Sequence, residues 1–404
     1  MEKATRHQIK EQNRNLVLKT IFERSDISRA EIARVTRLTR TTVSDIVSDL
    51  LDERLVKEVG TGSSLGGKSP ILLDIAADSR YLIGLDLARN KFSGAIVNLR
   101  GQICAFVSRP IKECNREAAL QTTCEIIDHL IGPGLPTHQP LVGIGIGAPG
   151  LINSKDGVVI NAVNLDWVNL PLGKLLEERY HLPVCLLNDC QAAAMGEYIY
   201  AADLSEARNM VVVRVGHGIG AGIIINGQIF QGDGGSAGEI GHIVVTTDQT
   251  LSCRCGNVGC LETLASANAL VQRAELAVMR IPPYPQPTAL AKHAGSITLE
   301  LIEQAFAEGD ALAQEIVLEA GRYLGIALAN LISTLNIHKI ILIGDMACFG
   351  QPWLAAIQET MSQATLGRLA QETSVQIGDL KDNDVILGVS ALMASNYSLL
   401  FQKQ

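Results

Sequence analysis

The chain has 404 residues, too many for one hydrophobic core, so two to three domains are expected. It is 47% hydrophobic but only 4% aromatic, a composition typical of α/β layers joined by tight turns. The charged N-terminus leads into no apolar segment, and the longest apolar region (residues 323–344) contains polar residues, which argues against a signal peptide and a membrane span. Nine cysteines, an odd number, favour a reducing cytoplasm.

The net charge of −8 is unevenly distributed along the chain. Residues 1–70 carry 13 Lys and Arg against 10 Asp and Glu, a balance of +3. The remaining residues therefore carry 21 against 32, a balance of −11. A basic end on an acidic body favours nucleic-acid binding at that end alone.

The first seventy residues predict three helices followed by a two-stranded wing. Residues 16–22 show apolar helical spacing, Ser28 and Glu31 form a capping box that begins a second helix, and Thr39 caps a third. The expected core face of the third helix is Val43, Ile46, Val47, Leu50 and Leu51. Two helices joined by a short turn predict a helix-turn-helix. The alternative is an ordinary three-helix bundle with solvated arginines.

The start of the third helix would read base edges in the major groove. Arg40 can bond guanine bidentately, threonine methyls can contact thymine, and Arg29 and Arg37 suit phosphates. Lys68 stands at the tip of the wing, between strands expected at 55–59 and 69–75. The candidate DNA-binding residues are Arg29, Arg37, Thr39, Arg40, Thr41, Thr42, Ser44 and Lys68.

Beyond residue 78 the pattern predicts strands alternating with helices. Strands are expected at 81–87, 92–99, 102–110, 141–147, 183–187, 210–215, 221–226 and 339–343, and helices at 115–131, 171–180, 310–335 and 384–401. One strand ends at Asn188 and Asp189, and ligands gather at the carboxyl ends of strands in such sheets. Alternatively, either residue is simply the N-cap of the following helix.

Residues 238–262 read GEIGHIVVTTDQTLSCRCGNVGCLE. His242, Cys253, Cys255 and Cys260 supply the donor set of a closed structural zinc site. The alternative is three buried or incidental cysteines, since free cysteine packs as a small hydrophobe. Glu239 and Glu262 flank these ligands, and acceptor carboxylates beside a rigid metal site suit a polyhydroxylated ligand.

GEIGH followed by CRCGNVGCLE resembles the signature of the ROK family (repressors, open reading frames, sugar kinases), and the resemblance extends over roughly residues 80–400. It implies an actin-like, two-lobed sugar kinase fold with zinc in the larger lobe. The N-terminal segment is similar to the winged helix-turn-helix fused to ROK repressors. The expected α/β architecture is therefore a winged helix-turn-helix (1–78), a small lobe (79–190, completed by a C-terminal helix, 384–404) and a large lobe with the zinc site (191–383).

The resemblance also implies a set of sugar-binding residues. Carried over by motif, they are Asn164, Asn188, Asp189, Glu239, His242 and Glu262. In the family's kinases the residue matching Asp189 takes the proton from the sugar hydroxyl, a general-base role. His242 would contact zinc through one ring nitrogen and donate to a hydroxyl through the other.

The segments that bind nucleotide in the family's kinases differ in this chain. Their first turn reads roughly D-x-G-G-T, where this chain has Asp86-Leu87-Ala88-Arg89-Asn90. The second turn, Gly216-His217-Gly218-Ile219-Gly220, is partly preserved, and Gly344-Asp345-Met346 replaces a glycine-rich turn. The first turn lacks both glycines and the threonine, and Asp345 would repel a nucleotide phosphate. Because of these departures, no enzymatic activity is expected. Alternatively, Arg89 binds phosphate in a new way and residual kinase activity remains.

The sequence therefore predicts a sugar-responsive transcriptional repressor of carbohydrate-metabolism genes, most like the xylose-repressor and N-acetylglucosamine-repressor branches of the family. We expect a cytoplasmic homodimer or homotetramer on a palindromic operator, with structural Zn²⁺ as cofactor, a small sugar in the interlobe cleft and no membrane partner. Two alternatives stay open. One is an ATP-dependent sugar kinase with a DNA-binding head, and the other is a regulator controlled by a protein partner.

Overall fold

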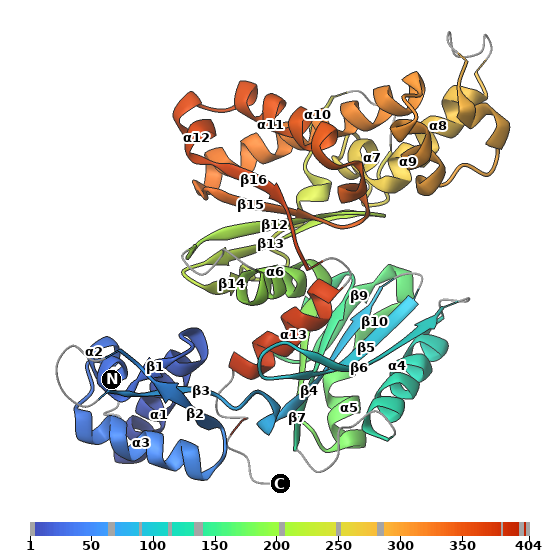
Figure 1. Ribbon diagram of the computed structural model, residues 1–404. Coiled ribbons are helices and arrows are strands. Elements are labelled where there is room, and N and C mark those ends of the chain that lie inside the picture. Colours follow the sequence, from blue (N-terminus) through green and yellow to red (C-terminus); the bar gives the residue numbers. More distant parts are fainter. Residues whose placement is uncertain are drawn as a thin grey trace. The chain divides into compact units, whose positions relative to one another are not determined.

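The structure is a computed structural model, and it describes residues 5–63, 69–88, 91–111, 115–132, 140–201, 207–247, 252–280, 287–380, 383–395 and 400. The chain forms two compact units, Met1–Leu187 with Val389–Gln404, and Asn188–Gly388. It passes between them at the start of helix α6 (Asp189–Tyr200) and inside helix α13 (Asp384–Ser395) (Figure 1). The finer division at 1–78, 79–190 and 191–383 stays a prediction.

The first unit begins with a head of three helices and a small sheet (residues 5–75). The helices are α1 (Arg6–Glu23), α2 (Arg29–Thr36) and α3 (Arg40–Asp52), and the antiparallel strands are β1 (Ile27–Ser28), β3 (Ile71–Ile75) and β2 (Val56–Thr61), in that order. Both predicted caps are confirmed. Ser28 and Glu31 form a reciprocal capping box, and the Thr39 hydroxyl accepts from the Thr42 N–H at 3.2 Å. Of the predicted core face of α3, Val43, Ile46, Val47 and Leu50 are buried and Leu51 is half-buried.

A five-stranded mixed sheet forms the centre of the first unit. Its strands are β11 (Val184–Asn188), β7 (Leu141–Ala148), β4 (Tyr81–Leu87), β5 (Lys91–Asn98) and β6 (Ile103–Pro110), in that order. The predicted antiparallel run β4-β5-β6 is confirmed, and β7 runs parallel to β4. Helices α4 (Arg116–Ile131) and α5 (Leu172–Tyr180) pack in the same core. Three further strands, β8 (Leu151–Asn153), β9 (Val158–Ala162) and β10 (Trp167–Leu170), form a second antiparallel sheet that the sequence did not indicate.

The head and the rest of the first unit have one common hydrophobic core. The residues outside the head that pack into the head's buried cluster are Leu82, Leu99, Val142, Met393, Ala394 and Leu400. Arg100, in the turn between β5 and β6, adds polar contacts. Its guanidinium donates to the Phe22 carbonyl oxygen at 2.7 Å, pairs with Asp74 and lies 5.4 Å from the centre of the Phe22 ring. The head is therefore packed into its unit and not merely tethered to it.

The second unit is built on another five-stranded sheet. Its strands are β14 (Gln228–Phe230), β13 (Ile219–Ile225), β12 (Met210–Val215), β15 (Lys339–Ile343) and β16 (Ser374–Ile377), in that order. Helix α6 covers one face. The helices on the other side of the sheet are α7 (Glu262–Ala265), α8 (Ala267–Val278), α9 (Leu299–Ala307), α10 (Ala311–Leu335), α11 (Gly350–Ala364) and α12 (Gly367–Glu372). The predicted hairpin turn at Asn226 and Gly227 is confirmed.

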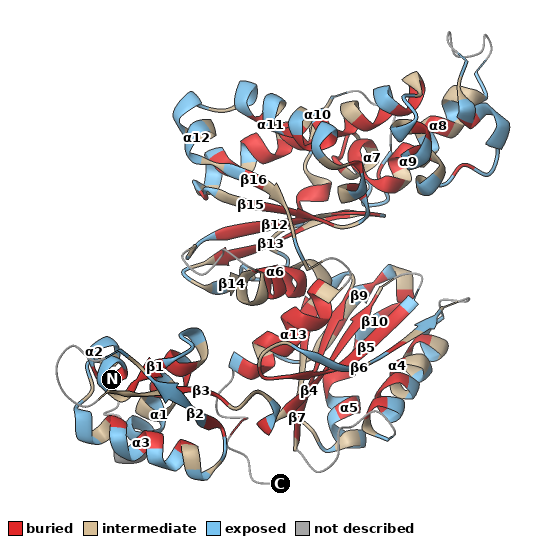
Figure 2. Cartoon of the chain, in the orientation of Figure 1, coloured by how far each residue is buried: buried red, intermediate tan, exposed pale blue. Residues whose placement is uncertain are grey.

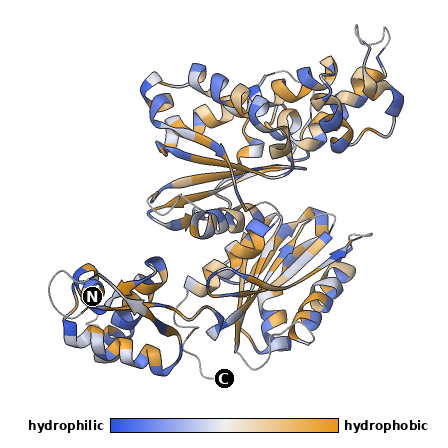
Figure 3. Cartoon of the chain, viewed as in Figure 1, coloured by the Kyte–Doolittle hydropathy of each residue, from blue (hydrophilic) through white to orange (hydrophobic). Residues whose placement is uncertain are grey.

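Helix α10 is long and apolar enough, by length and composition, to cross a bilayer. However, 61% of its most apolar window is buried inside the protein, where it packs with Val211, Val213 and Val215 of β12. Figure 2 shows that the strands of both five-stranded sheets are largely buried, and Figure 3 shows that they are largely hydrophobic. Helix α10 is thus the central core helix of the second unit.

Helices α6 and α13 cross at two glycines within the second unit. A Cβ on Gly388 would overlap the Ala192 carbonyl oxygen and lie 2.6 Å from its carbon, and one on Gly196 would lie 3.1 Å from the Asp384 carbonyl carbon. Only glycine leaves room for this approach. In the first unit the same helix packs on β7, because a Cβ on Gly145 would lie 2.8 Å from the Val389 carbonyl oxygen. Helix α13 is therefore a packed element of both units.

Candidate functional site

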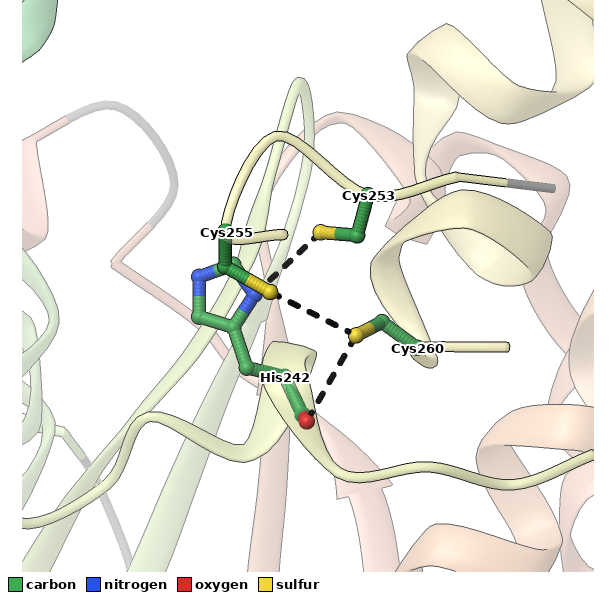
Figure 4. A group of neighbouring side chains, drawn as sticks. All are labelled: His242, Cys253, Cys255 and Cys260. Atoms are coloured by element: carbon green, nitrogen blue, oxygen red, sulfur yellow. Dashed lines mark hydrogen bonds between the residues drawn. The ribbon is translucent and has the colours of Figure 1, made fainter. Parts of the chain in front are cut away.

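Four side chains converge on one point in the loop that follows β14 (Figure 4). They are His242, at the end of the 3-10 helix η3 (Ile240–His242), and Cys253, Cys255 and Cys260, and their ligand atoms lie within 4.8 Å of one another. Cys253 Sγ is 3.5 Å from His242 Nδ1, and Cys255 Sγ is 3.7 Å from Cys260 Sγ. A tetrahedron with metal–sulfur bonds of about 2.3 Å has edges of about 3.8 Å. These two distances are close to that edge length, so the cluster could hold a metal ion such as Zn²⁺.

Local backbone structure holds these ligands in place. The Cys253 N–H donates to the Asn257 carbonyl oxygen at 2.8 Å, and the Gly256 N–H donates to the Cys253 carbonyl oxygen at 2.9 Å, which closes a tight turn around the thiols. Gly259 has a φ of 75°, and a Cβ there would overlap the Thr246 carbonyl oxygen. Glycine is thus needed at this position for the loop to close.

The pKa values of the three thiols are shifted in different directions. Burial raises the pKa of Cys253 and of Cys260, whereas a hydrogen bond from the Asn257 backbone lowers the pKa of Cys255. Zn²⁺ binds thiolates, so a bound ion would supply the positive charge that two buried thiolates need. The donor set and its spacing fit a structural zinc ion held by His242 and the three cysteines.

Strand β11 ends at Asn188, and α6 begins at Asp189. The Asn188 side-chain oxygen accepts from the N–H of Cys190 at 2.9 Å and of Gln191 at 3.3 Å, so Asn188 is the N-cap of α6. The N-cap alternative therefore holds for Asn188 and not for Asp189. The Asp189 carboxylate lies on the first turn of the helix, where it accepts from the Cys190 N–H at 3.0 Å.

The second unit brings three of the predicted acidic residues near one another: Asp189, Glu239 and Glu262. Crowding by protein atoms raises the pKa of Glu239, although that residue keeps part of its surface exposed. The charges of Asp189 and Glu262 raise this pKa further, whereas His242 and Arg254 lower it. A group of carboxylates beside the metal-type cluster offers several hydrogen-bond acceptors to hydroxyl groups.

Glu262 makes two contacts of its own. Its side chain is 12% exposed, one carboxylate oxygen accepts from the Ile219 N–H at 3.1 Å, and the other lies 3.2 Å from Arg254 Nε. Arg254 was not among the predicted site residues. The available signal was its place between two candidate ligands, Cys253 and Cys255, on the loop that also carries Glu262.

The segment Gly216–Gly220 connects β12 to β13, and we call it the glycine turn. Each of its glycines faces a side chain from another part of the second unit. A Cβ on Gly216 would lie 2.8 Å from Asp345 Oδ2, one on Gly218 would lie 2.6 Å from Glu262 Oε2, and one on Gly220 would lie 2.7 Å from Cys190 Sγ. The His217 ring is 3.1 Å from Asn268 Oδ1. The turn therefore lies beside both Asp345 and the predicted sugar-binding residues.

Other predicted residues lie elsewhere. Asn164 belongs to the first unit, on the 3-10 helix η2 (Val163–Leu165), where it is half-buried. Asp86 is buried near the end of β4, whereas Arg89 and Asn90 lie outside the described residues. The structure therefore describes the whole of the second predicted phosphate turn, residues 216–220, but only part of the first, residues 86–90.

On the head, most candidate DNA-binding residues line the start of α3. Arg37, Thr39, Arg40, Thr41 and Ser44 are exposed, Arg29 and Thr42 are half-buried, and Lys68 lies outside the described residues. Arg29 lies 3.5 Å from the Glu58 carboxylate, and the Thr39 hydroxyl is used in the cap of α3. Arg37 has a φ of 59° in the turn between α2 and α3.

The sequence pattern of the ROK family matches residues 82–396. This chain belongs to the ROK family. It is similar to a xylose repressor of Caldicellulosiruptor bescii, with 32% identity over 390 residues that cover 96% of each chain.

Two solved structures extend the comparison. A ROK family transcriptional regulator, homologous to the Escherichia coli MLC protein, has a TM-score of 0.85 at 27% identity and covers 97% of this chain and 98% of its own. The ROK family glucokinase from Streptomyces griseus, in complex with glucose and AMPPNP, has a TM-score of 0.67 at 29% identity and covers 77% of this chain and 98% of its own. The chain thus has the actin-like ROK sugar kinase fold.

Proposed function

We propose that this ROK protein is a sugar-responsive transcriptional repressor of carbohydrate-metabolism genes. The observation that carries the proposal is the extent of the similarity. The xylose repressor and the ROK regulator match 96% and 97% of this chain, which includes the head, whereas the glucokinase matches 77%. A kinase-like body joined to a helical head is thus common to this chain and to regulators of transcription.

The head would act as a winged helix-turn-helix. Helix α3 would enter the major groove of a palindromic operator with Arg40, Thr41 and Ser44 toward the bases, while Arg29 and Arg37 contact phosphates. A homodimer or homotetramer would present two heads to the two half-sites. We propose that the protein acts in the cytoplasm.

The effector sugar would bind through Asn188, Asp189, Glu239, His242 and Glu262, whereas Asn164 stays a prediction from the sequence. Carboxylates accept from sugar hydroxyls, and a zinc-bound imidazole can donate through its other ring nitrogen. Zn²⁺ would hold the loop that carries Glu239 and His242. Sugar binding changes operator affinity only if the protein has two conformations that differ in operator affinity and the sugar binds one of them more tightly than the other.

The central test measures operator affinity, by fluorescence anisotropy of labelled DNA, against a panel of aldoses and N-acetylated hexosamines up to millimolar concentration. At least one sugar should change the dissociation constant by about 5- to 150-fold, the usual range of coupling between two binding sites. An unchanged affinity across the panel would contradict sugar sensing. A pull-down from sugar-grown cells would then test control by a protein partner.

A sugar kinase with a DNA-binding head is the second candidate, favoured by the likeness to the glucokinase. We propose that this activity is lost, because Asp345 faces the glycine turn and the D-x-G-G-T sequence is replaced by residues 86–90. A coupled assay of ATP turnover with the same panel of sugars should show none. Turnover that disappears in Asp189→Asn would establish the kinase instead.

Replacing Arg40 by Ala should weaken operator binding by about 1–3 kcal/mol, the contribution of a side chain that reads one base. Anisotropy with operator and with nonspecific DNA checks this, because loss of a base contact affects the operator alone. Arg368→Ala, which removes an exposed arginine of α12 in the second unit, should leave both affinities unchanged. If the affinities for operator and for nonspecific DNA fell equally, Arg40 would contact only a phosphate and would not read a base.

A further inference from the structure

The glycine turn bears on the chemical class of the effector. A turn that binds phosphate offers unpaired backbone N–H groups to the anion. Here two of these groups are already hydrogen-bonded within the protein. The Ile219 N–H donates to Glu262 Oε2 at 3.1 Å, and the Gly216 N–H donates to the Gly218 carbonyl oxygen at 3.0 Å. An incoming phosphate would have to displace a carboxylate to reach the first of them.

Side chains also occupy the space that the glycines leave open. The Asp345 carboxylate stands against Gly216, the Glu262 carboxylate against Gly218 and the Cys190 thiol against Gly220. Burial raises the pKa of Cys190, and the charge of Asp189 raises it further, so this thiol stays neutral. Two of these three groups are therefore anionic. The Arg254 guanidinium also lies 3.7 Å from a Cβ on Gly218, but it is paired with the Glu262 carboxylate.

The charges around the turn are predominantly negative. Four carboxylates lie on or beside it: Asp189, Glu239, Glu262 and Asp345. Two guanidinium groups of the described residues lie nearby, and each already faces a carboxylate, since Arg254 is 3.2 Å from Glu262 and Arg214 is 3.8 Å from Asp384. A phosphate ester would add about two negative charges to this surrounding. Within the part of the chain that the structure describes, both of these guanidinium groups are paired with carboxylates, so neither is free to offset this repulsion.

We infer that the effector is an uncharged sugar and that phosphorylated sugars and nucleotides are rejected at the glycine turn. The inference rests on the proposed function, because it concerns the same ligand. Glu262 belongs to the predicted sugar-binding set and also lies against Gly218 of the glycine turn. Cys190, which lies against Gly220, directly follows the predicted sugar-binding residue Asp189. A phosphate attached to a sugar held by these residues would therefore meet the turn.

The test compares each neutral sugar with its own phosphate ester. Labelled operator is titrated with the protein in the presence of xylose, glucose or N-acetylglucosamine, of the terminal phosphate monoester of each, or of inorganic phosphate alone. One neutral sugar should change operator affinity, and its ester should need an at least about tenfold higher concentration, as repulsion between like charges in a partly screened site requires. The difference should shrink at high ionic strength.

The outcomes separate the inference from the function on which it rests. An ester that acts at the same or a lower concentration than its sugar overturns the inference and leaves the repressor intact. If neither class alters operator binding, the sugar-responsive function fails and the inference fails with it.

A variant tests the electrostatic cause. Asp345→Asn keeps nearly the same shape and removes one negative charge. The ratio between the effective concentrations of the ester and of its sugar, which we call the gap, should therefore fall severalfold. The concentration of neutral sugar that changes operator binding should stay the same. Glu308→Gln removes an exposed carboxylate at the end of α9 and should leave the gap as it was. A gap that is unchanged in Asp345→Asn, or narrowed equally by both variants, overturns the assignment of the effect to the glycine turn.

Discussion

Replacing Cys255 by Ser should remove Zn²⁺ and most of the response to sugar. Cys255 is the exposed member of the four-ligand cluster, and a serine hydroxyl does not replace a thiolate on zinc. Structural zinc contributes about 10–16 kcal/mol to the folding of small zinc-dependent peptides, so loss of one ligand should free the loop that carries Glu239 and His242. We expect zinc, measured by elemental analysis, to fall from about one ion per chain to nearly none. The sugar concentration needed to change operator binding should rise at least about tenfold.

A matched control is Cys104→Ser, an exposed cysteine on β6 of the first unit, which should keep both zinc and the sugar response. Without sugar, the Cys255 variant should still bind operator, because the head belongs to the first unit and the metal ligands to the second. Operator binding that falls as far as the sugar response would disprove this separation. A variant that retains one zinc ion per chain would show that the cluster is not the metal site.

Replacing Gly388 by Ala should be among the most destabilising single-methyl changes in the chain. The new Cβ would overlap the backbone of Ala192 and lie 2.8 Å from the Gly196 nitrogen, so helices α6 and α13 would have to separate. Overpacking of this kind costs about 3 kcal/mol when backbone must move. For a unit of this size the melting temperature should fall by about 6–12 °C, which differential scanning calorimetry can measure.

Gly367→Ala is the matched control for this variant. Gly367 begins α12, and a Cβ there would meet nothing within 4 Å. Because alanine is the better helix former, this change should be neutral or slightly stabilising. If Gly388→Ala melted at the same temperature as Gly367→Ala, the close crossing of α6 and α13 would not exist in solution.

Much of the local structure could be predicted because its causes are local in the sequence. The capping box of Ser28 and Glu31 and the cap by Thr39 each involve residues three positions apart, and both are present. The four metal-type ligands lie on one loop whose glycines permit its turns, so their clustering was also readable. The presence of zinc, the sugar contacts and the DNA contacts remain predictions.

The features that could not be predicted are contacts between residues far apart in the sequence and short strands with too few residues to show a hydrophobic pattern. The approach of Asp345 to Gly216 joins turns more than a hundred residues apart, so neither segment reveals it alone. The strands β8 and β10 are three and four residues long, too short for an alternation to stand out. The contact between Gly388 and Ala192 likewise follows from the crossing of two distant helices.

The common core of the first unit limits how the protein can be divided. Leu82, Leu99, Val142 and Met393 fill part of the interior of the head, and a buried side chain of this kind contributes about 1.5–3 kcal/mol. Truncating the protein after β3 would expose the core of the head to water. It would also leave an exposed hydrophobic patch on the rest of the first unit. Because the head and the sheet have a common core, a distortion of β4 or β7 would change the orientation of α3, the helix that we propose to contact DNA.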